Sequence, residues 1–279
     1  MPYSAEISRR NPTCFLFLID QSGSMDDPFG AESGKKKCDG VADAINRLIQ
    51  TLILRCAKGE GIRDYFHIGV IGYGDQVGPA FGGPLAGRTL VPIGEVANNP
   101  LRVEDRTRTV EDGAGGLVEE TIKFPVWFEP RADGHTPMVA ALTLAERILA
   151  DFISQFRASF PPIVLNLTDG EPTDGDPEPA AVAIRDLATN DGNVLLFNLH
   201  ISSQRAALIQ FPDSDAGLPD ESARRLFRMS SILPASFLAV AREKKFNVTE
   251  ASRGFVFNAD LISVIQFLDV GTRVDRNLR

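Results

Sequence analysis

The sequence is poor in cysteine and histidine, with three of each among its 279 residues. Cys14, Cys38 and Cys56 are too few and too widely spaced to build a disulfide framework or a zinc site. We therefore interpret them as small apolar residues of a strand and a helix, in a protein of a reducing compartment.

Long apolar runs are also missing. The longest, Cys14 to Ile19, has six residues, whereas a membrane-spanning helix needs about 20. It follows Arg9 and Arg10, as the core of a secretory signal would, but it is too short and leads into Asp20 instead of a cleavage site of small residues. We expect a cytoplasmic protein with no targeting segment and no membrane contact.

The chain has no excess of positive charge. Its 29 basic residues face 37 acidic ones, a net charge of −8, which argues against nucleic-acid binding. With 43% hydrophobic residues, a chain of this length can bury a large core. Because no repeat, low-complexity segment or linker composition interrupts it, we predict a single domain over residues 1–279.

What the sequence contains is an alternation of strand and helix patterns. Short apolar runs of the kind found in buried parallel strands occur at 14–20, 66–74, 88–96, 162–169, 193–201 and 254–259. Apolar residues at helical spacing occur at 38–56, 137–156, 180–189 and 261–270, with a further helical pattern around 237–245. This predicts an α/β fold with a doubly wound, mostly parallel, Rossmann-like sheet and helices on both faces.

Two stretches exceed a minimal version of this fold. Residues 97–134 are rich in glycine, arginine and acidic residues, with a β ribbon predicted at 117–128, and residues 202–253 form a second excursion. Insertions of this length in a compact domain are usually functional or disordered. We expect them to shape a binding face.

Five polar residues are expected at one edge of the sheet. Asp20, Ser22 and Ser24 follow the first strand in D-Q-S-G-S-M, Asp169 ends a later buried strand in L-T-D-G-E-P, and Thr136 opens a helix in G-H-T-P-M, where it is also a good helix cap. An all-oxygen set without histidine or cysteine suits a hard cation such as Mg²⁺, with Mn²⁺ as an alternative, and disfavours zinc.

The combination of D-x-S-G-S, T-P-M and T-D-G resembles the von Willebrand factor type A (VWA) domain and its metal-ion-dependent adhesion site, in the family's order and over nearly the whole chain. The resemblance implies that Ser22, Ser24 and Thr136 contact the metal and that Asp20 and Asp169 act through water or hydrogen bonds. It also implies that an Asp or Glu of a partner protein completes the coordination. The implied function is divalent-cation-dependent protein binding, without enzymatic turnover.

The late segments L-P-D-E-S-A-R-R-L-F-R-M-S-S-I-L-P and G-F-V-F-N-A-D-L are similar to an intracellular bacterial branch of the family, encoded near tellurium-resistance-type loci. In that branch a protein kinase and a protein phosphatase are encoded nearby. The resemblance therefore implies a partner from such a signalling set.

Enzymatic alternatives are considered as well. Asp20 at a strand end would suit a Mg²⁺-dependent hydrolase or phosphatase with an aspartyl nucleophile, but Ser22 stands where such enzymes have a second aspartate as general acid. A serine hydrolase would need a histidine base, and no G-x-S-x-G elbow is present near His135.

Several neighbouring residues have plainer interpretations. We interpret Asp174, Asp176 and Glu178 as a solvated loop, because the twelve-residue calcium pattern is missing, and residues 35–37 as an exposed lysine run. Phe29 is either a hydrophobic contact beside the ion or a packed anchor of its loop.

Overall fold

The computed structural model describes residues 2–29, 34–59, 61–111, 116–201 and 207–259, together with Gln266. Its centre is a sheet with the strand order β13-β14-β12-β9-β1-β4-β5, in which β6 pairs with β4 outside this path. The five central strands run parallel, and the short β5, β6 and β13 are antiparallel to their neighbours. The predicted doubly wound, mostly parallel sheet is confirmed.

The sheet strands are β1 (Thr13–Asp20), β4 (Phe66–Tyr73), β5 (Val77–Pro79), β6 (Val91–Pro92), β9 (Ile163–Thr168), β12 (Leu195–Ile201), β13 (Ile209–Gln210) and β14 (Phe255–Ala259). The helices are α1 (Lys37–Cys56), α2 (Ile93–Asn98), α3 (Met138–Gln155), α4 (Glu178–Asp186), α5 (Glu221–Met229) and α6 (Ala235–Glu243), with short 3-10 turns at Gly23–Asp26 and Gly83–Leu85. Two small hairpins, β2 (Ala57–Lys58) with β3 (Gly61–Ile62) and β10 (Ala188–Thr189) with β11 (Gly192–Asn193), decorate the body.

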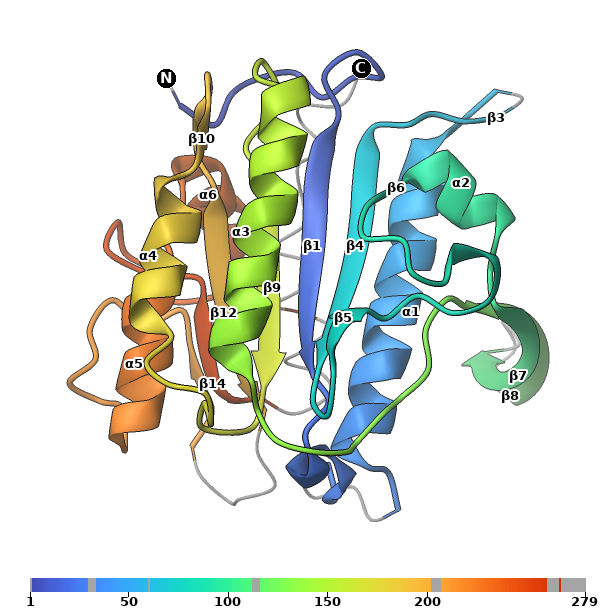
Figure 1. The fold of residues 1–279 in the computed structure, drawn as a ribbon. Helices are drawn as coiled ribbons and strands as arrows, with labels where there is room; N and C mark the ends of the chain where they lie inside the picture. Colours follow the sequence, from blue (N-terminus) through green and yellow to red (C-terminus); the bar gives the residue numbers. More distant parts are fainter. Residues whose placement is uncertain are drawn as a thin grey trace.

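Helices cover both faces of the sheet. Figure 1 shows α3, α4 and α5 in front of it, α1 and α6 behind it, and α2 beside the β4 edge, next to α1. All eight residues of β1 are buried, and its side chains alternate between the two layers: Phe15 and Phe17 belong to the core cluster with α1, whereas Leu16 and Leu18 belong to the cluster with α3. This two-sided burial explains why the strand is continuously apolar.

The three cysteines are free and buried, which confirms their interpretation as small apolar residues. Among the residues with described coordinates, no helix is long and apolar enough to cross a membrane. The helix predicted at 261–270 lies outside the described residues, except for Gln266, which is helical.

One predicted strand is wrong. Of residues 88–96, only Val91 and Pro92 are extended, and α2 begins at Ile93. The helix starts there because Asp64, which is distant in the sequence, accepts a hydrogen bond at Oδ1 from the Gly94 N–H (2.8 Å) and so satisfies a first-turn donor. No local pattern reveals such a cap.

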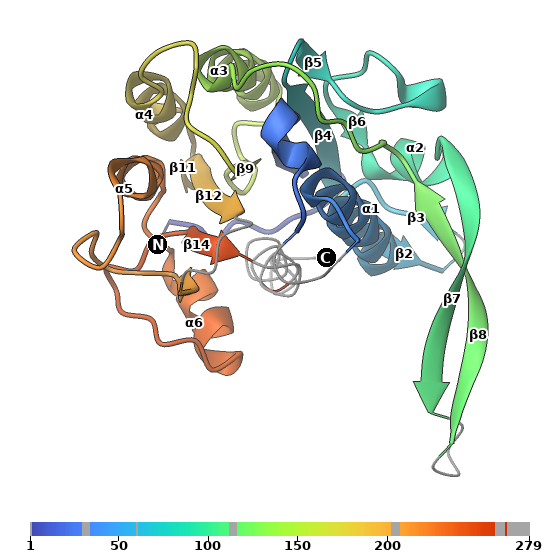
Figure 2. The ribbon, with the colours of Figure 1, turned by 90° about the horizontal axis from the view of Figure 1, so that it is seen from below.

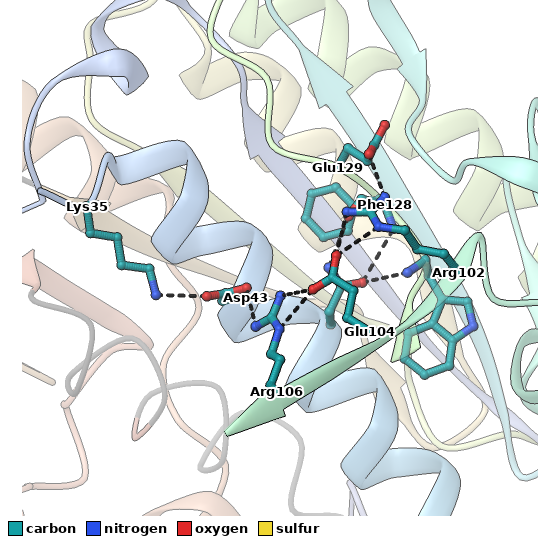
Figure 3. Close-up of polar contacts among 9 residues, drawn as sticks. Lys35, Asp43, Arg102, Glu104, Arg106, Phe128 and Glu129 are labelled. Atoms are coloured by element: carbon teal, nitrogen blue, oxygen red, sulfur yellow. Dashed lines mark hydrogen bonds and ion pairs between the residues drawn. The ribbon is translucent and has the colours of Figure 1, made fainter. Parts of the chain in front are cut away.

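The first insertion forms a long antiparallel ribbon, β7 (Arg102–Glu111) with β8 (Leu117–Val126), which extends away from the body (Figure 2). Polar contacts fasten its base to α1: the Arg106 guanidinium bonds Asp43 (2.8 Å) and Glu104 (2.7 Å), and Lys35 also reaches Asp43 (Figure 3). The ribbon predicted at 117–128 is thus present, with β7 as its second strand. Within the second insertion, α5 and α6 join the two helical layers.

Candidate metal site

The candidate site lies at the carboxyl edge of the parallel strands, the lower edge in Figure 1 and the one facing the viewer in Figure 2. The chain leaves β1 for β4 on one side and later returns to β9 on the other, so β1 and β9 flank the point where strand order reverses. Ligands of open α/β sheets bind in the crevice formed at this point. Asp20 ends β1, and Asp169 directly follows β9.

Asp20 is fully buried and held by its neighbours. Its Oδ1 accepts a hydrogen bond from the Ser22 N–H (2.9 Å), and its Oδ2 accepts one from the Thr168 hydroxyl (2.6 Å). Burial raises the pKa of Asp20 to about 6, against the opposing effect of these hydrogen bonds. Through its bond to the Ser22 N–H, the carboxyl group orients the loop that carries Ser22 and Ser24, which we call the serine loop.

The serine loop is joined to the segment that leads to Thr136. The Gly23 N–H donates to the Gly134 carbonyl (3.1 Å), and the Asp133 N–H donates to the Gln21 carbonyl (2.6 Å). Gly134 has a φ of +80°, and a Cβ there would lie 2.4 Å from the Asp75 nitrogen, so only glycine fits. This close approach brings Thr136 to the ends of β1 and β9.

The hydroxyl groups gather beside Asp169. The Ser22 and Ser24 Oγ atoms are 3.1 Å apart, and Ser24 Oγ donates to Asp169 Oδ1 (2.7 Å). A Cβ placed on Gly170 would lie 3.5 Å from Thr136 Oγ1 and 4.0 Å from Ser24 Oγ, so both hydroxyls flank this glycine. The structure therefore brings all five predicted residues together.

Thr136 does not cap α3, so the expected capping role is wrong. The helix begins at Met138, and the Asp174 carboxylate accepts hydrogen bonds from the N–H groups of Val139 (3.1 Å) and Ala140 (2.8 Å). The Thr136 N–H donates to the Thr173 hydroxyl (3.1 Å), and the Thr173 N–H donates to the Thr136 carbonyl (2.9 Å), so the backbone of Thr136 is fixed. Within the described residues Thr136 Oγ1 makes no hydrogen bond, so it remains available as a ligand.

Lys37 is a site residue that the sequence analysis misses, and its interpretation as exposed is wrong. Its side chain is 5% exposed, and its ammonium lies 2.6 Å from Oδ2 of Asp169, whose side chain is 1% exposed. The ammonium also donates to the Ser24 carbonyl (3.3 Å) and lies 3.6 Å from Asp27 Oδ2. The signal was the position of Lys37, four residues before the buried Val41 on the apolar face of α1.

The donor chemistry fits a hard divalent cation. Three hydroxyls and two carboxylates meet at one point, and within the described ranges no group of three or more His, Cys, Asp or Glu residues offers an alternative metal site. Neutral hydroxyl ligands would leave most of the charge of Mg²⁺ or Mn²⁺ uncompensated. Lys37 adds a competing positive charge, because its ammonium already occupies one oxygen of Asp169.

Phe29 is the packed anchor of its loop. Its side chain is buried, and its ring fills the space above Gly40 of α1, where a Cβ would lie 2.2 Å from the Phe29 Cδ1 atom. It therefore offers no exposed contact beside the site. A pocket of about 340 Å³ does open next to the serine loop, lined by Gln21, Phe81, Leu101 and Arg131 among others.

In the part of the chain that the structure describes, the three histidines are not bonded to the serines. His67 packs against Phe152 and Phe156, and His200 stacks on Phe257 at a ring distance of 4.8 Å. His135 is exposed at the rim. Within the described residues, no hydrogen bond joins a histidine to Ser22 or Ser24.

Fold and site together define the class: an α/β protein with a cluster of hydroxyls and carboxylates at the switch point of a doubly wound sheet. No protein-family model matches the sequence, and no curated protein matches it either.

Solved structures are similar at low identity. The PilB minor pilin from Streptococcus sanguinis matches with 11% identity and a TM-score of 0.48, over 97% of this chain and 63% of its own. The ArnB paralog VWA2 from Sulfolobus acidocaldarius matches with 16% identity and a TM-score of 0.35, over 70% and 36%. The vWF domain of the pili tip protein Mfa5 from Porphyromonas gingivalis has 12% identity and a TM-score of 0.31, over 58% and 39%. The chain thus spans less than two thirds of the length of each of these proteins.

Proposed function

We propose that this protein is a VWA-like module that binds an acidic partner protein through a divalent cation. Ser22, Ser24 and Thr136 are the proposed metal ligands. Asp20 and Asp169 orient these ligands and the water around the cation, and their negative charge balances part of its positive charge. The observation that carries the proposal is the convergence of these hydroxyls beside Asp169 at the switch point. The cation supplies a Lewis-acidic position that a carboxylate of the partner can occupy.

The surroundings of the site agree with recognition of a protein surface. The pocket lined by Gln21 and Arg131 adjoins the serine loop and has room for residues that flank the partner's acidic side chain. Arg131 is exposed and Ser24 is exposed, so both are accessible to a partner. A cytoplasmic location and a partner from a kinase and phosphatase signalling set belong to the same proposal.

The metal part is tested by thermal unfolding with Mg²⁺ or Mn²⁺ against EDTA. A ligand present at 100 times its Kd adds about 2.7 kcal/mol of stability, so the cation should raise the Tm. Ser22→Ala should abolish this response, whereas Ser154→Ala, on the exposed surface of α3, should leave it intact. A response that survives Ser22→Ala and Asp20→Ala would place the cation elsewhere.

The partner part is tested by capture with Mg²⁺ and with EDTA. A protein that is captured with Mg²⁺ and released by EDTA supports the proposal under two conditions. The Ser22→Ala variant must fail to capture it, and replacement of one Asp or Glu of the partner must also abolish capture. Hydrolysis of phosphomonoesters or esters with Mg²⁺, lost in Asp20→Asn, would instead favour the enzymatic alternative.

A further inference from the structure

A second pocket lies away from the candidate metal site, between the amino-terminal end of β12, the end of α4 and the segment that joins α5 to α6. It has a volume of about 460 Å³, and Arg185, Asn193, Ile232, Pro234 and Arg253 are among its lining residues. Asp186 also lines it, as an exposed residue. Two arginines in one pocket of an acidic protein need an explanation.

Within the described residues, the guanidinium of Arg185 forms no ion pair. Burial lowers its pKa, and the more distant charges of Asp186 and Glu178 oppose this shift. The Arg185 Nε atom is buried and has no hydrogen-bond partner within the described residues. No described carboxylate lies within 4.0 Å of it, although Asp186 is the next residue along the chain. An unpaired buried donor of a charged group is costly. Its presence in a pocket wall makes this donor available to an acceptor other than the described residues.

Arg253 is fixed in place as the second cation. Its Nη1 donates to the carbonyls of Ser230 (2.7 Å) and Arg228 (3.3 Å), and its guanidinium lies 5.0 Å from the centre of the Phe227 ring. Burial lowers the pKa of Arg253, and the charge of Arg185 lowers it further. Arg185 and Arg253 thus both line the pocket and lie close enough for their charges to repel, while the charge of Asp215 opposes this effect on Arg253.

The pocket also has an apolar wall. Ile232 is 51% exposed, and the half-buried Pro234 and the half-buried ring of Tyr3 line the same pocket, whereas Leu233, between Ile232 and Pro234 in the sequence, is buried in the core. We propose that this pocket binds an organic phosphate monoester, with Arg185 and Arg253 holding the phosphate dianion and the Ile232–Pro234 wall contacting its apolar group. Guanidinium groups match phosphate in a bidentate geometry, and a dianion is attracted to two of them more strongly than a monocarboxylate is. The charge of Asp186 in the lining is exposed to solvent, which screens it.

The test measures binding of three probes in EDTA, so that the metal site plays no part. Phenyl phosphate supplies a dianion on an apolar group, benzoate supplies a monoanion on the same group, and inorganic phosphate lacks the apolar group. We expect calorimetry to give the order phenyl phosphate, then inorganic phosphate, with benzoate weakest. Equal binding of benzoate and phenyl phosphate would overturn the phosphate assignment, and equal binding of the two phosphates would overturn the role of the apolar wall.

Variants assign the binding to this pocket. Arg185→Met should weaken phenyl phosphate binding about tenfold or more, because a hydrogen bond to a charged group is lost. Arg185 makes no side-chain hydrogen bond within the described residues, so this variant should fold. Arg47→Met, at an exposed position of α1, is the matched control. Unchanged binding in Arg185→Met, or no binding by the wild type, overturns the proposal.

Discussion

At the scale of single residues, the charge of the candidate metal site depends on Lys37. Its ammonium holds Asp169 at 2.6 Å in an environment closed to solvent, and a divalent cation must share that carboxylate with it. Lys37→Met removes the competing charge, so we expect Mg²⁺ to bind at least about tenfold more tightly, which corresponds to about 1.4 kcal/mol of binding free energy. Calorimetric titration of the metal measures this change.

The same substitution should destabilise the metal-free protein. It leaves Asp169 buried without its partner, which costs about 3 kcal/mol in comparable pairs. Lys36→Met is the control, since Lys36 is exposed and pairs with the equally exposed Asp26. A fall in metal affinity in Lys37→Met would show that Lys37 positions the ligands and does not compete with the cation.

Asp20 gives the metal-free protein a distinct pH dependence. Its pKa rises from 3.8 to about 6 on folding, so the protonated carboxyl contributes stability below pH 3.8 that is lost as the pH rises through 6. The neutral isostere in Asp20→Asn avoids this loss. At pH 7 in EDTA we expect Asp20→Asn to be more stable than the wild type, by on the order of 3 kcal/mol, as measured by urea unfolding.

The titration of His200 changes the free energy of unfolding in the opposite direction to that of Asp20. The pH dependence of the Asp20→Asn variant is therefore easier to interpret than that of the wild type. Burial lowers the pKa of His200 from 6.5 to about 4, so its contribution to stability is present above pH 6.5 and lost as the pH falls towards 4. Between pH 4 and 6 the two groups offset each other. Asp20→Asn should therefore lose about 1.4 kcal/mol per pH unit on acidification across this window relative to the wild type. Parallel pH curves would contradict the raised pKa of Asp20.

Sequence reasoning found the five oxygen-bearing residues because strand ends and helix starts are local features with characteristic residues. It missed Lys37 because the partner of this lysine, Asp169, is 132 residues away. It also mistook Thr136 for a helix cap, since the true cap, Asp174, reaches α3 from a later loop. What escaped prediction was, in each case, a contact between distant segments.

At the scale of elements, helices with a local sequence pattern could be predicted, and a helix that depends on contacts with other segments could not. The helices α1 and α3 carry apolar residues at helical spacing over 20 and 18 residues. In contrast, α5 has nine residues, several of them charged, and it becomes a helix through the Asp220 cap on the Ala223 N–H and through burial of one narrow face. The equally short α4 and α6 could be predicted because their apolar residues recur at helical spacing, so what α5 lacks is this local pattern.

The attachment of the ribbon to α1 depends on Asn46, a buried side chain in the middle of that helix. Its Oδ1 accepts a hydrogen bond from the Trp127 N–H (2.8 Å), and its Nδ2 donates to the Phe128 carbonyl (3.0 Å). Asn46→Ala leaves both backbone groups buried without these partners, so we expect a loss of about 2 kcal/mol or more. Urea unfolding against Asn190→Ala, an exposed control, measures it; equal stability of the two variants would contradict this role.

At the scale of the whole molecule, the sheet forms the core, whereas the outer part of the ribbon contributes little to it. The β7–β8 ribbon pairs along ten residues of each strand and points away from the body (Figure 2). Its β8 strand is exposed from Leu117 to Thr121, and Leu117 itself is 73% exposed. A part of the chain that buries so little contributes little to the stability of the core. Its base, in contrast, is fixed by Arg106 on Asp43 and by the Trp127 indole N–H on the Val96 carbonyl (2.6 Å).

This separation predicts that the outer ribbon can be removed. Replacement of residues 107–121 by an Asn-Gly turn joins Arg106 to its cross-strand partner Ile122 and keeps every contact of the base. We expect the Tm and its response to Mg²⁺ to stay close to those of the wild type, because none of the described residues that are removed belongs to either core cluster. Loss of cooperative unfolding would make the outer ribbon part of the core. An intact Mg²⁺ response with weaker partner capture would make it a second contact surface, which acts beside the cation and independently of it.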